Sequence, residues 1–272
     1  MESESGLALR NTALVTGASS GIGAAFARVF AERGFDLVLT ARRRDRLEAL
    51  AAELRERHGC VVQVIAADLA DPAAPLRIAS EVASAGLQVD ALVNNAGYGL
   101  PGSFLSIPWE RHRDFLQVMV TSVAELCRAF APGMVERRRG WIVNVGSVAG
   151  LVPAVAGHTL YGASKALVIR FSESLAHELE PHGVHVTALC PGFTYSEFHD
   201  VNGMRPQVSR LPSFLWLDAD TVAREGYEAV VRGRAVHVNG RVYRAIVLAA
   251  RLAPAWLVNL VGRRLGSTYR RT

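Results

Sequence analysis

The stretch Thr16-Gly17-Ala18-Ser19-Ser20-Gly21-Ile22-Gly23 decides the fold of this chain of 272 residues. It follows the apolar run 12–16 and precedes the amphipathic run 21–33, so it predicts a glycine-rich turn between a strand and a helix. Glycines there let the backbone turn tightly and approach a phosphate, which the helix N-terminus then binds. The pattern G-x-x-x-G-x-G is not the more familiar G-x-G-x-x-G, and an ordinary glycine-rich turn is the alternative interpretation. The residues that we expect to hold a dinucleotide pyrophosphate are Gly17, Ser19, Ser20, Gly21, Ile22 and Gly23.

Short apolar runs alternate with longer amphipathic stretches along the rest of the chain. The runs predict strands at Thr12–Thr16, Asp36–Thr40, Val61–Ala66, Ala91–Asn94, Trp141–Val145, Val184–Leu189 and Ala235–Val238. The stretches predict helices at Gly21–Arg33, Arg44–His58, Ala73–Ala85, Trp109–Phe130, Tyr161–Glu180 and Thr221–Arg232. Apolar strands separated by helices indicate an α/β fold, a single doubly wound Rossmann domain with a mostly parallel sheet and helices on both faces. Ligands bind such sheets beyond the carboxyl ends of the strands.

No break in composition suggests a second domain. We predict that residues 1–240 form the Rossmann domain, with a substrate loop at about 197–220. Residues 241–272 should form an apolar and basic helical extension packed on the same domain. The loop is rich in apolar side chains, namely Phe198, Met204, Leu211, Phe214, Leu215 and Trp216. These residues either cover an apolar substrate or pack against the segment 245–262, and the two interpretations weigh equally.

The composition excludes several classes of protein. The net charge of +5 comes from basic residues scattered along the chain, which favours a solvated surface over nucleic-acid binding. The three cysteines and eight histidines show no disulfide or metal-ligand spacing, so we expect no metal, a reducing compartment and a cytoplasmic location. Residues 1–11 lack the apolar region of a secretory signal. Arg251 and Pro254 interrupt the segment 245–262, so packing is favoured over crossing a membrane, and contact with a membrane surface is the less favoured alternative.

Lys165 is the only lysine among thirty basic side chains. Every other basic side chain of the Lys and Arg type is an arginine, so we infer that position 165 requires an ammonium group. An ammonium is compact and shifts its pKa readily. Tyr161 lies four residues earlier, which on a helix places both side chains on one face. The ammonium should stabilise the phenolate and lower the pKa of Tyr161 from about 10 toward working pH. Tyr161 is therefore a candidate general acid and base, and the alternative is a surface lysine near a core tyrosine.

The second predicted strand ends at Leu39-Thr40-Ala41-Arg42-Arg43. An acidic residue at this place binds the ribose 2′-hydroxyl of NAD, whereas an arginine accommodates the 2′-phosphate of NADP. Arg42 and Arg43 offer bidentate phosphate donors, which favours NADP(H) as the cofactor. The alternative is that both arginines begin the exposed face of the next helix. Asp68, after the third strand, either accepts from the adenine amino group or caps the following helix.

Three further motifs follow predicted strands. Asn95, Ala96 and Gly97 follow the fourth strand, where small residues leave room for a ribose, although the run alone is only a turn signal. Ser147 follows the fifth strand and could hold a substrate oxygen while Tyr161 exchanges a proton. After the sixth strand, the backbone of the run Pro191, Gly192 and Thr194 could bracket a nicotinamide amide.

Together these motifs resemble the short-chain dehydrogenase/reductase family over about residues 11–238. The residues that carry the resemblance are Gly17, Gly21, Gly23, the run 94–97, Ser147, Tyr161, Lys165 and Pro191-Gly192. The resemblance implies hydride transfer between a nicotinamide and an alcohol or carbonyl. It implies that Tyr161 is the acid/base, that Lys165 binds the nicotinamide ribose and lowers the Tyr161 pKa, and that Ser147 orients the substrate. Many members form dimers or tetramers through two long helices, and the run 186–192 resembles a bacterial subgroup similar in part to long-chain ketoacyl reductases.

The chain departs from the family at Met119, where most members carry an asparagine that helps hold a proton-relaying water. A thioether accepts weakly and cannot donate, so we expect a weakened relay with hydride transfer retained. The expected function is an NADP-dependent oxidoreductase acting on a carbonyl or secondary alcohol of a small, apolar molecule. The alternative is an NADP(H)-binding sensor or scaffold with weak or no catalysis. A second departure, Ser196 in place of threonine, keeps the hydroxyl.

Overall fold

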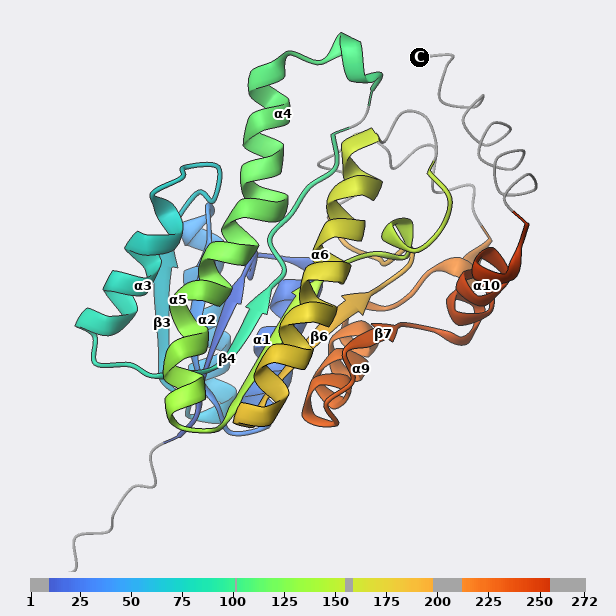
Figure 1. The fold of residues 1–272 in the computed structure, drawn as a ribbon. Helices are drawn as coiled ribbons and strands as arrows, with labels where there is room; N and C mark the ends of the chain where they lie inside the picture. Colours follow the sequence, from blue (N-terminus) through green and yellow to red (C-terminus); the bar gives the residue numbers. More distant parts are fainter. Residues whose placement is uncertain (1–9, 101, 155–158, 198–211, 255–272) are drawn as a thin grey trace, which may run out of the picture.

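The computed structural model describes residues 10–100, 102–154, 159–197 and 212–254. Its seven strands form one sheet in the order β3-β2-β1-β4-β5-β6-β7, and every neighbouring pair is parallel (Figure 1). The strands are β1 (Thr12–Thr16), β2 (Asp36–Ala41), β3 (Val62–Ala66), β4 (Val89–Asn94), β5 (Gly140–Val145), β6 (Val184–Cys190) and β7 (Val236–Val238). The predicted doubly wound parallel sheet is confirmed. The strand order reverses between β1 and β4, and such a reversal opens a crevice at the carboxyl ends of the strands.

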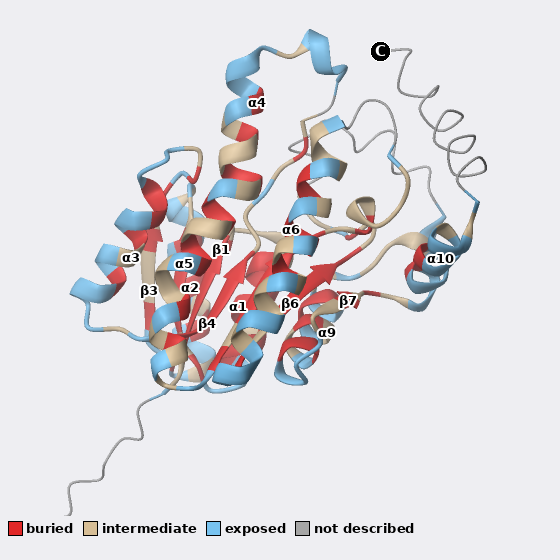
Figure 2. Ribbon diagram, in the orientation of Figure 1, coloured by how far each residue is buried: buried red, intermediate tan, exposed pale blue. Residues whose placement is uncertain are grey.

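Helices cover both faces of the sheet. One apolar core lies between the sheet and the helices α1 (Gly21–Glu32), α2 (Arg44–His58) and α9 (Ala219–Val231). A second lies between the other face and the helices α3 (Ala74–Ser84), α5 (Ser122–Glu136) and α6 (Thr159–Leu179). Figure 2 shows the buried residues concentrated on the central strands and on the inner sides of these helices. Both faces of the central strands β1, β4, β5 and β6 are thus largely buried, which explains why these strands are mostly apolar.

The long helix predicted at 109–130 runs further and is not uniform. It comprises α4 (Trp109–Leu116), a π-helical segment at Gln117–Thr121, and α5, and in Figure 1 its first part projects beyond the sheet. Within the described residues this helix, Trp109–Glu136, is long and apolar enough to cross a membrane. Its α5 part packs against α3 and β4, and such contacts explain its apolar composition as that of a core helix. π-Helical turns are rare and frequently lie at functional sites.

A buried chain of polar side chains joins the two central strands to the helices behind them. Asn94 and Asn144 are paired in register, and Asn94 Nδ2 donates to Asn144 Oδ1 at 2.8 Å. Asn144 Nδ2 donates to Ser172 Oγ at 2.9 Å, and Ser172 Oγ donates to Val168 O at 2.7 Å. All three side chains are almost fully buried. Because buried polar groups must be satisfied by one another, this chain fixes α6 against the strand ends that precede the site.

Candidate active site

The glycine-rich turn adopts a conformation that side chains would obstruct. Gly17 and Gly21 have φ values of 66° and 54°, in the left-handed region that favours glycine. A Cβ on Gly23 would lie 2.3 Å from the carbonyl oxygen of Gly17, so a larger residue there would displace the turn. Asn95 Nδ2 donates to the carbonyl oxygens of Thr16 and Gly17 at 3.0 and 3.3 Å. The loop after β4 therefore holds the turn in its shape.

Helix α1 begins at Gly21, and its N-cap residue makes no side-chain capping hydrogen bond. Ser20 stands at the N-cap with no side-chain cap hydrogen bond, and the first turn contains no acidic residue. The first N–H groups and the positive end of the helix dipole therefore remain directed toward an anion. These features fit the pyrophosphate of a dinucleotide at this turn.

The structure separates the two arginines that follow β2. Arg43 Nη2 donates to Ser19 Oγ and to Ser20 Oγ, both at 3.1 Å, whereas Arg42 is exposed. Arg43 Nη1 also donates to Glu197 Oε2 at 2.9 Å, and Arg46 donates to the other carboxylate oxygen. The donors of Arg43 and Arg46 therefore converge on an anion beside the glycine-rich turn, and Arg42 makes none of these contacts. Sequence reasoning named Arg43 but missed Arg46 and Glu197, because only the tertiary fold brings them together.

Ser147, Tyr161 and Lys165 meet at the carboxyl ends of β5 and β6. Ser147 follows β5, its Oγ accepts a hydrogen bond from Ala149 N at 3.1 Å, and its side chain hydrogen-bonds to Tyr161. Lys165 is buried, and its Nζ donates to Val145 O at 2.7 Å. The same Nζ lies 5.9 Å from the centre of the Tyr161 ring. The helical spacing of four residues thus places the tyrosine and the lysine on one face of α6, as predicted.

The predicted pKa of Tyr161 requires a correction. Burial raises its pKa above the ordinary value, and the hydrogen bond with Ser147 only partly opposes this rise. Burial also lowers the pKa of Lys165 to about 8. Desolvation therefore disfavours the charged form of both groups, and the lowering that opposes it at Tyr161 comes from Ser147 rather than from Lys165. The prediction that Lys165 lowers the pKa of Tyr161 toward working pH was therefore wrong.

The loop after β6 is clamped by a residue that the sequence analysis missed. Tyr243, on helix α10 (Arg241–Leu252), accepts a hydrogen bond from Phe193 N at 3.0 Å and donates to Leu215 O at 2.6 Å. A Cβ on Gly192 would lie 2.0 Å from Cζ of this tyrosine, so only glycine lets the ring pack there. The predicted extension after residue 240 thus contributes α10 to the site, while residues 255–272 lie outside the described residues.

The other residues predicted after strand ends take varied places. Thr194 Oγ1 donates to Gly192 O at 3.1 Å, and Pro191 O accepts from Val148 N at 3.0 Å, so both shape the loop. Asp68 Oδ1 accepts from Ala70 N at 3.0 Å within its own turn, and α3 begins only at Ala74 with Ala73 at its N-cap, so Asp68 does not cap that helix. Ala96 N donates to Thr16 Oγ1 at 3.0 Å, beside the glycine-rich turn.

The substrate-loop residues divide between the two interpretations. Leu215 packs with Tyr243 and Val247 of α10, as the packing interpretation requires. Phe214, in contrast, is 66% exposed, and Tyr195 stacks on Trp216 with ring centres 4.7 Å apart. Phe198, Met204 and Leu211 lie outside the described residues. The rings of Phe214 and Tyr195 are thus largely exposed and do not belong to the core.

Met119 lies against the loop after β4. It belongs to the π-helical segment and is 1% exposed, and a Cβ on Gly97 would lie 2.9 Å from its Sδ. The thioether therefore fills space where the family more often has an amide. Neither a hydrogen-bond donor nor a strong acceptor is present in this side chain.

Replacing Met119 with asparagine should raise the turnover of carbonyl reduction severalfold, because the shorter amide leaves room for a water and supplies polar groups to hold it. The melting temperature should fall, because a polar group replaces a buried apolar one. Met119→Leu, which adds no polar atom, is the control. Steady-state kinetics measure the effect, and an unchanged or lower kcat in Met119→Asn contradicts the proton-relay argument.

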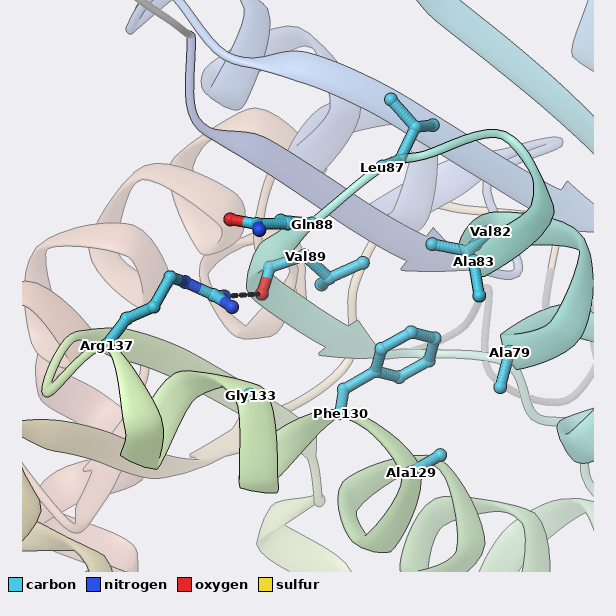
Figure 3. Close-up of a pocket in the computed structure, with 10 residues that line it drawn as sticks. All are labelled: Ala79, Val82, Ala83, Leu87, Gln88, Val89, Ala129, Phe130, Gly133 and Arg137. Atoms are coloured by element: carbon cyan, nitrogen blue, oxygen red, sulfur yellow. Dashed lines mark hydrogen bonds between the residues drawn. The ribbon is translucent and has the colours of Figure 1, made fainter.

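A separate cavity of about 200 Å³ lies between α3 and α5, next to Val89 at the start of β4 (Figure 3). Ser147 follows the end of the parallel strand β5, so the cavity lies at the opposite edge of the sheet. Arg137 lines it, and its Nη2 donates to Val89 O at 2.9 Å. The remaining lining is mostly alanine, valine, leucine and phenylalanine. Within the described ranges, no three histidine, cysteine or acidic side chains gather as a metal site. The chemistry-bearing residues therefore concentrate at the carboxyl edge of the sheet.

An enzyme that exchanges a hydride with a dinucleotide needs a phosphate cradle and an acid/base at one edge of the sheet, and this chain places both there. Residues 11–204 match the family described as short chain dehydrogenase. The chain belongs to this family of nicotinamide-dependent oxidoreductases that act on alcohol and carbonyl groups, so the resemblance predicted from the motifs is confirmed.

Relatives and solved structures agree with this assignment. An uncharacterized oxidoreductase of Myxococcus xanthus is 40% identical over 225 residues, which cover 82% of this chain and 85% of the relative. A short-chain dehydrogenase from Sphingobium yanoikuyae, solved in complex with NADPH, is 36% identical with a TM-score of 0.79, over 89% of this chain and 93% of its own. The bulky-bulky ketone specific alcohol dehydrogenase from Comamonas testosteroni is 32% identical with a TM-score of 0.75, over 89% and 92%.

Proposed function

We propose that this protein uses NADP(H) to interconvert a carbonyl and a secondary alcohol on an apolar, bulky substrate. We call the group of Arg43, Arg46, Ser19 and Ser20 the arginine cradle. The observation that carries the proposal is that Ser147, Tyr161 and Lys165 meet in a chain whose glycine-rich turn has this cradle. The NADPH in the Sphingobium structure supports the cofactor. Arg43, with its hydroxyl partners Ser19 and Ser20, would hold the 2′-phosphate, and the turn at Gly21 would hold the pyrophosphate. The bound nicotinamide would supply or accept the hydride.

The protein side chains manage the proton. In reduction, Tyr161 donates its phenolic proton to the oxygen of the substrate, and Ser147 donates a hydrogen bond to the same oxygen. Burial raises the pKa of Tyr161, so its hydroxyl is protonated before the reaction but is also a weaker acid, and the phenolate that it becomes needs stabilisation. Lys165, charged below its pKa, stabilises the phenolate that forms when the proton leaves. In the oxidation direction the same groups act in reverse.

The rate of reduction should fall as the pH rises through about 8, where Lys165 loses its proton. Its pKa is lowered by burial, so the ammonium is present below that pH and absent above it, while Cys190 stays a neutral thiol because burial raises its pKa to about 12. Tyr161 stays protonated over the same range. The pH profile of kcat/KM reports these groups in the free enzyme. A flat profile through pH 9, or the same decline in Lys165→Met, contradicts this assignment.

The substrate class is inferred from the aromatic border of the site. Phe214 and Tyr195 expose their rings beside the loop after β6, and apolar rings of this kind bind apolar substrates. The ketone specificity named for the Comamonas relative supports the same class. We therefore expect ketones with two large apolar substituents to be better substrates than short, polar ones.

We also propose that the protein acts as a homodimer or homotetramer in the cytoplasm. Helices α5 and α6 form an apolar groove of about 300 Å³ that includes Ala131, Phe171 and Leu175, and exposed apolar grooves often mark contacts with another subunit. The cysteines are all free and buried, which fits a reducing compartment. The proposal also places the boundary between the Rossmann domain and the C-terminal extension at residue 240. Light scattering on the purified protein measures its molar mass and therefore the number of subunits.

The test of the function is NADPH oxidation by the purified protein with a panel of apolar ketones and aldehydes. NADH replaces NADPH in a parallel series, and Tyr161→Phe is the catalytic control. Turnover that prefers NADPH and requires Tyr161 supports the proposal. Binding of NADPH without turnover on any carbonyl of the panel contradicts it and favours the cofactor-sensing alternative.

A further inference from the structure

A carboxylate of the protein itself occupies the arginine cradle. Glu197 Oε2 accepts from Arg43 Nη1 at 2.9 Å, and its other oxygen accepts from Arg46. The same two arginines hold the pKa of the Glu197 carboxyl below its usual range, so the group is an anion at neutral pH. The other donors of Arg43 reach the hydroxyls of Ser19 and Ser20. The cradle is therefore a complete anion site whose occupant comes from the loop after β6.

The contact of Glu197 draws this loop over the glycine-rich turn. We call residues 193–197 the strap. Ser196 lies so near Gly21 that a Cβ on this glycine would be 2.8 Å from the serine Cβ. The far side of the strap is held by Leu217, whose N donates to Phe193 O at 2.8 Å and whose O accepts from Tyr195 N at 2.9 Å. Glu197 is thus the point at which the strap is bound to the start of helix α2, beside the glycine-rich turn.

We propose that Glu197 is a specificity-determining residue, whose carboxylate occupies the 2′-phosphate subsite until the 2′-phosphate of NADP(H) displaces it. This proposal rests on the proposed use of NADP(H). A phosphate monoester carries nearly two negative charges and three acceptor oxygens, so it offers the arginines more than one carboxylate does. The two anions repel each other and cannot share the cradle. Binding of NADP(H) therefore unties the strap from α2.

NADH offers no anion that competes for the cradle. Its ribose hydroxyl leaves the contacts of Glu197 with Arg43 and Arg46 in place, so the strap stays tied while NADH binds. Only NADPH therefore loses binding free energy by displacing Glu197 from the arginines. Removing the charge of Glu197 should therefore tighten the binding of NADPH and leave that of NADH unchanged.

The experiment compares Glu197→Gln with Glu48→Gln in equilibrium titrations of NADPH, NADH and 2′,5′-ADP. Glu48 is a matched control because it makes a 3.5 Å ion pair with Arg44 on the same helix, and its substitution changes the net charge equally. Exposed ion pairs stabilise only weakly, so the Kd of Glu197→Gln for NADPH and for 2′,5′-ADP should fall by about fivefold, which corresponds to about 1 kcal/mol. The Kd of Glu48→Gln should stay near that of the wild type. Thermal melting checks that both variants are folded.

Each outcome of the titrations decides the proposal. A lower Kd of Glu197→Gln for NADPH and 2′,5′-ADP, with that for NADH unchanged, supports it. An equal or higher Kd for NADPH, or an equal fall for NADH, overturns it while the NADP(H) proposal stands. A wild-type protein that binds neither NADPH nor 2′,5′-ADP overturns both proposals.

Discussion

Tyr161→Phe reduces the turnover of carbonyl reduction by about a thousandfold, because a positioned general acid contributes on the order of 10²–10⁴ in rate. The phenylalanine ring keeps the packing of the tyrosine ring, and Ser147 and Lys165 remain in place. Only the proton that the substrate oxygen must receive is lost. We therefore expect the Kd for NADPH to stay within about twofold of the wild-type value, since the ring is retained and the cradle is untouched.

Single-turnover kinetics with a saturating ketone measure this effect, and fluorescence titration of NADPH measures the binding. Tyr227→Phe is the matched control, since it removes a phenol from helix α9, where the ring packs edge-on against Phe30. Its turnover should equal that of the wild type. A Tyr161→Phe variant that retains more than about a tenth of wild-type turnover would show that another group supplies the proton.

Arg43→Ala weakens NADPH binding by about 10- to 100-fold, because hydrogen bonds to charged groups are worth about 1.5–3 kcal/mol. Arg42→Ala is the matched control, since the neighbouring arginine carries the same charge but is exposed and makes none of the cradle contacts. We expect its Kd for NADPH to change by less than about threefold, as removal of an exposed charge does.

Calorimetric titration with NADPH and NADH distinguishes a phosphate contact from a general loss of structure. Arg43→Ala should leave the Kd for NADH nearly unchanged, because NADH has no 2′-phosphate. Equal weakening by Arg42→Ala and Arg43→Ala would mean that net charge, rather than the cradle at Ser19 and Ser20, attracts the cofactor.

Arg42 and Arg43 cannot be distinguished from the sequence alone. Both follow the same strand and both can bind phosphate, so the sequence offers no means of choosing between them. Their side chains leave the backbone in different directions, and only Arg43 meets the glycine-rich turn. Glu197 reaches the same point from a position more than 150 residues further along the chain. No local pattern marks such a residue.

The positions of the candidate catalytic residues were predicted more fully than those of the arginines. Tyr161 and Lys165 lie four residues apart on a regular helix, and helix geometry alone places their side chains on one face. Ser147 follows a strand, and parallel strands bring their carboxyl ends to one edge. The pKa of Tyr161, in contrast, depends on how deeply the site is buried, which the sequence does not state. The direction predicted for it was therefore wrong.

Local regularities determined the main features of this protein from its sequence. Apolar periodicity predicted the alternation of strands and helices, and Gly17, Gly21 and Gly23 predicted a tight turn, because periodicity and a positive φ are local properties of the chain. The tertiary structure alone decided which arginine faces the anion, that Tyr243 clamps Gly192, and that Asn94 bonds to Asn144. These contacts join residues far apart in sequence, and their geometry is set by the packing of whole elements rather than by any local pattern.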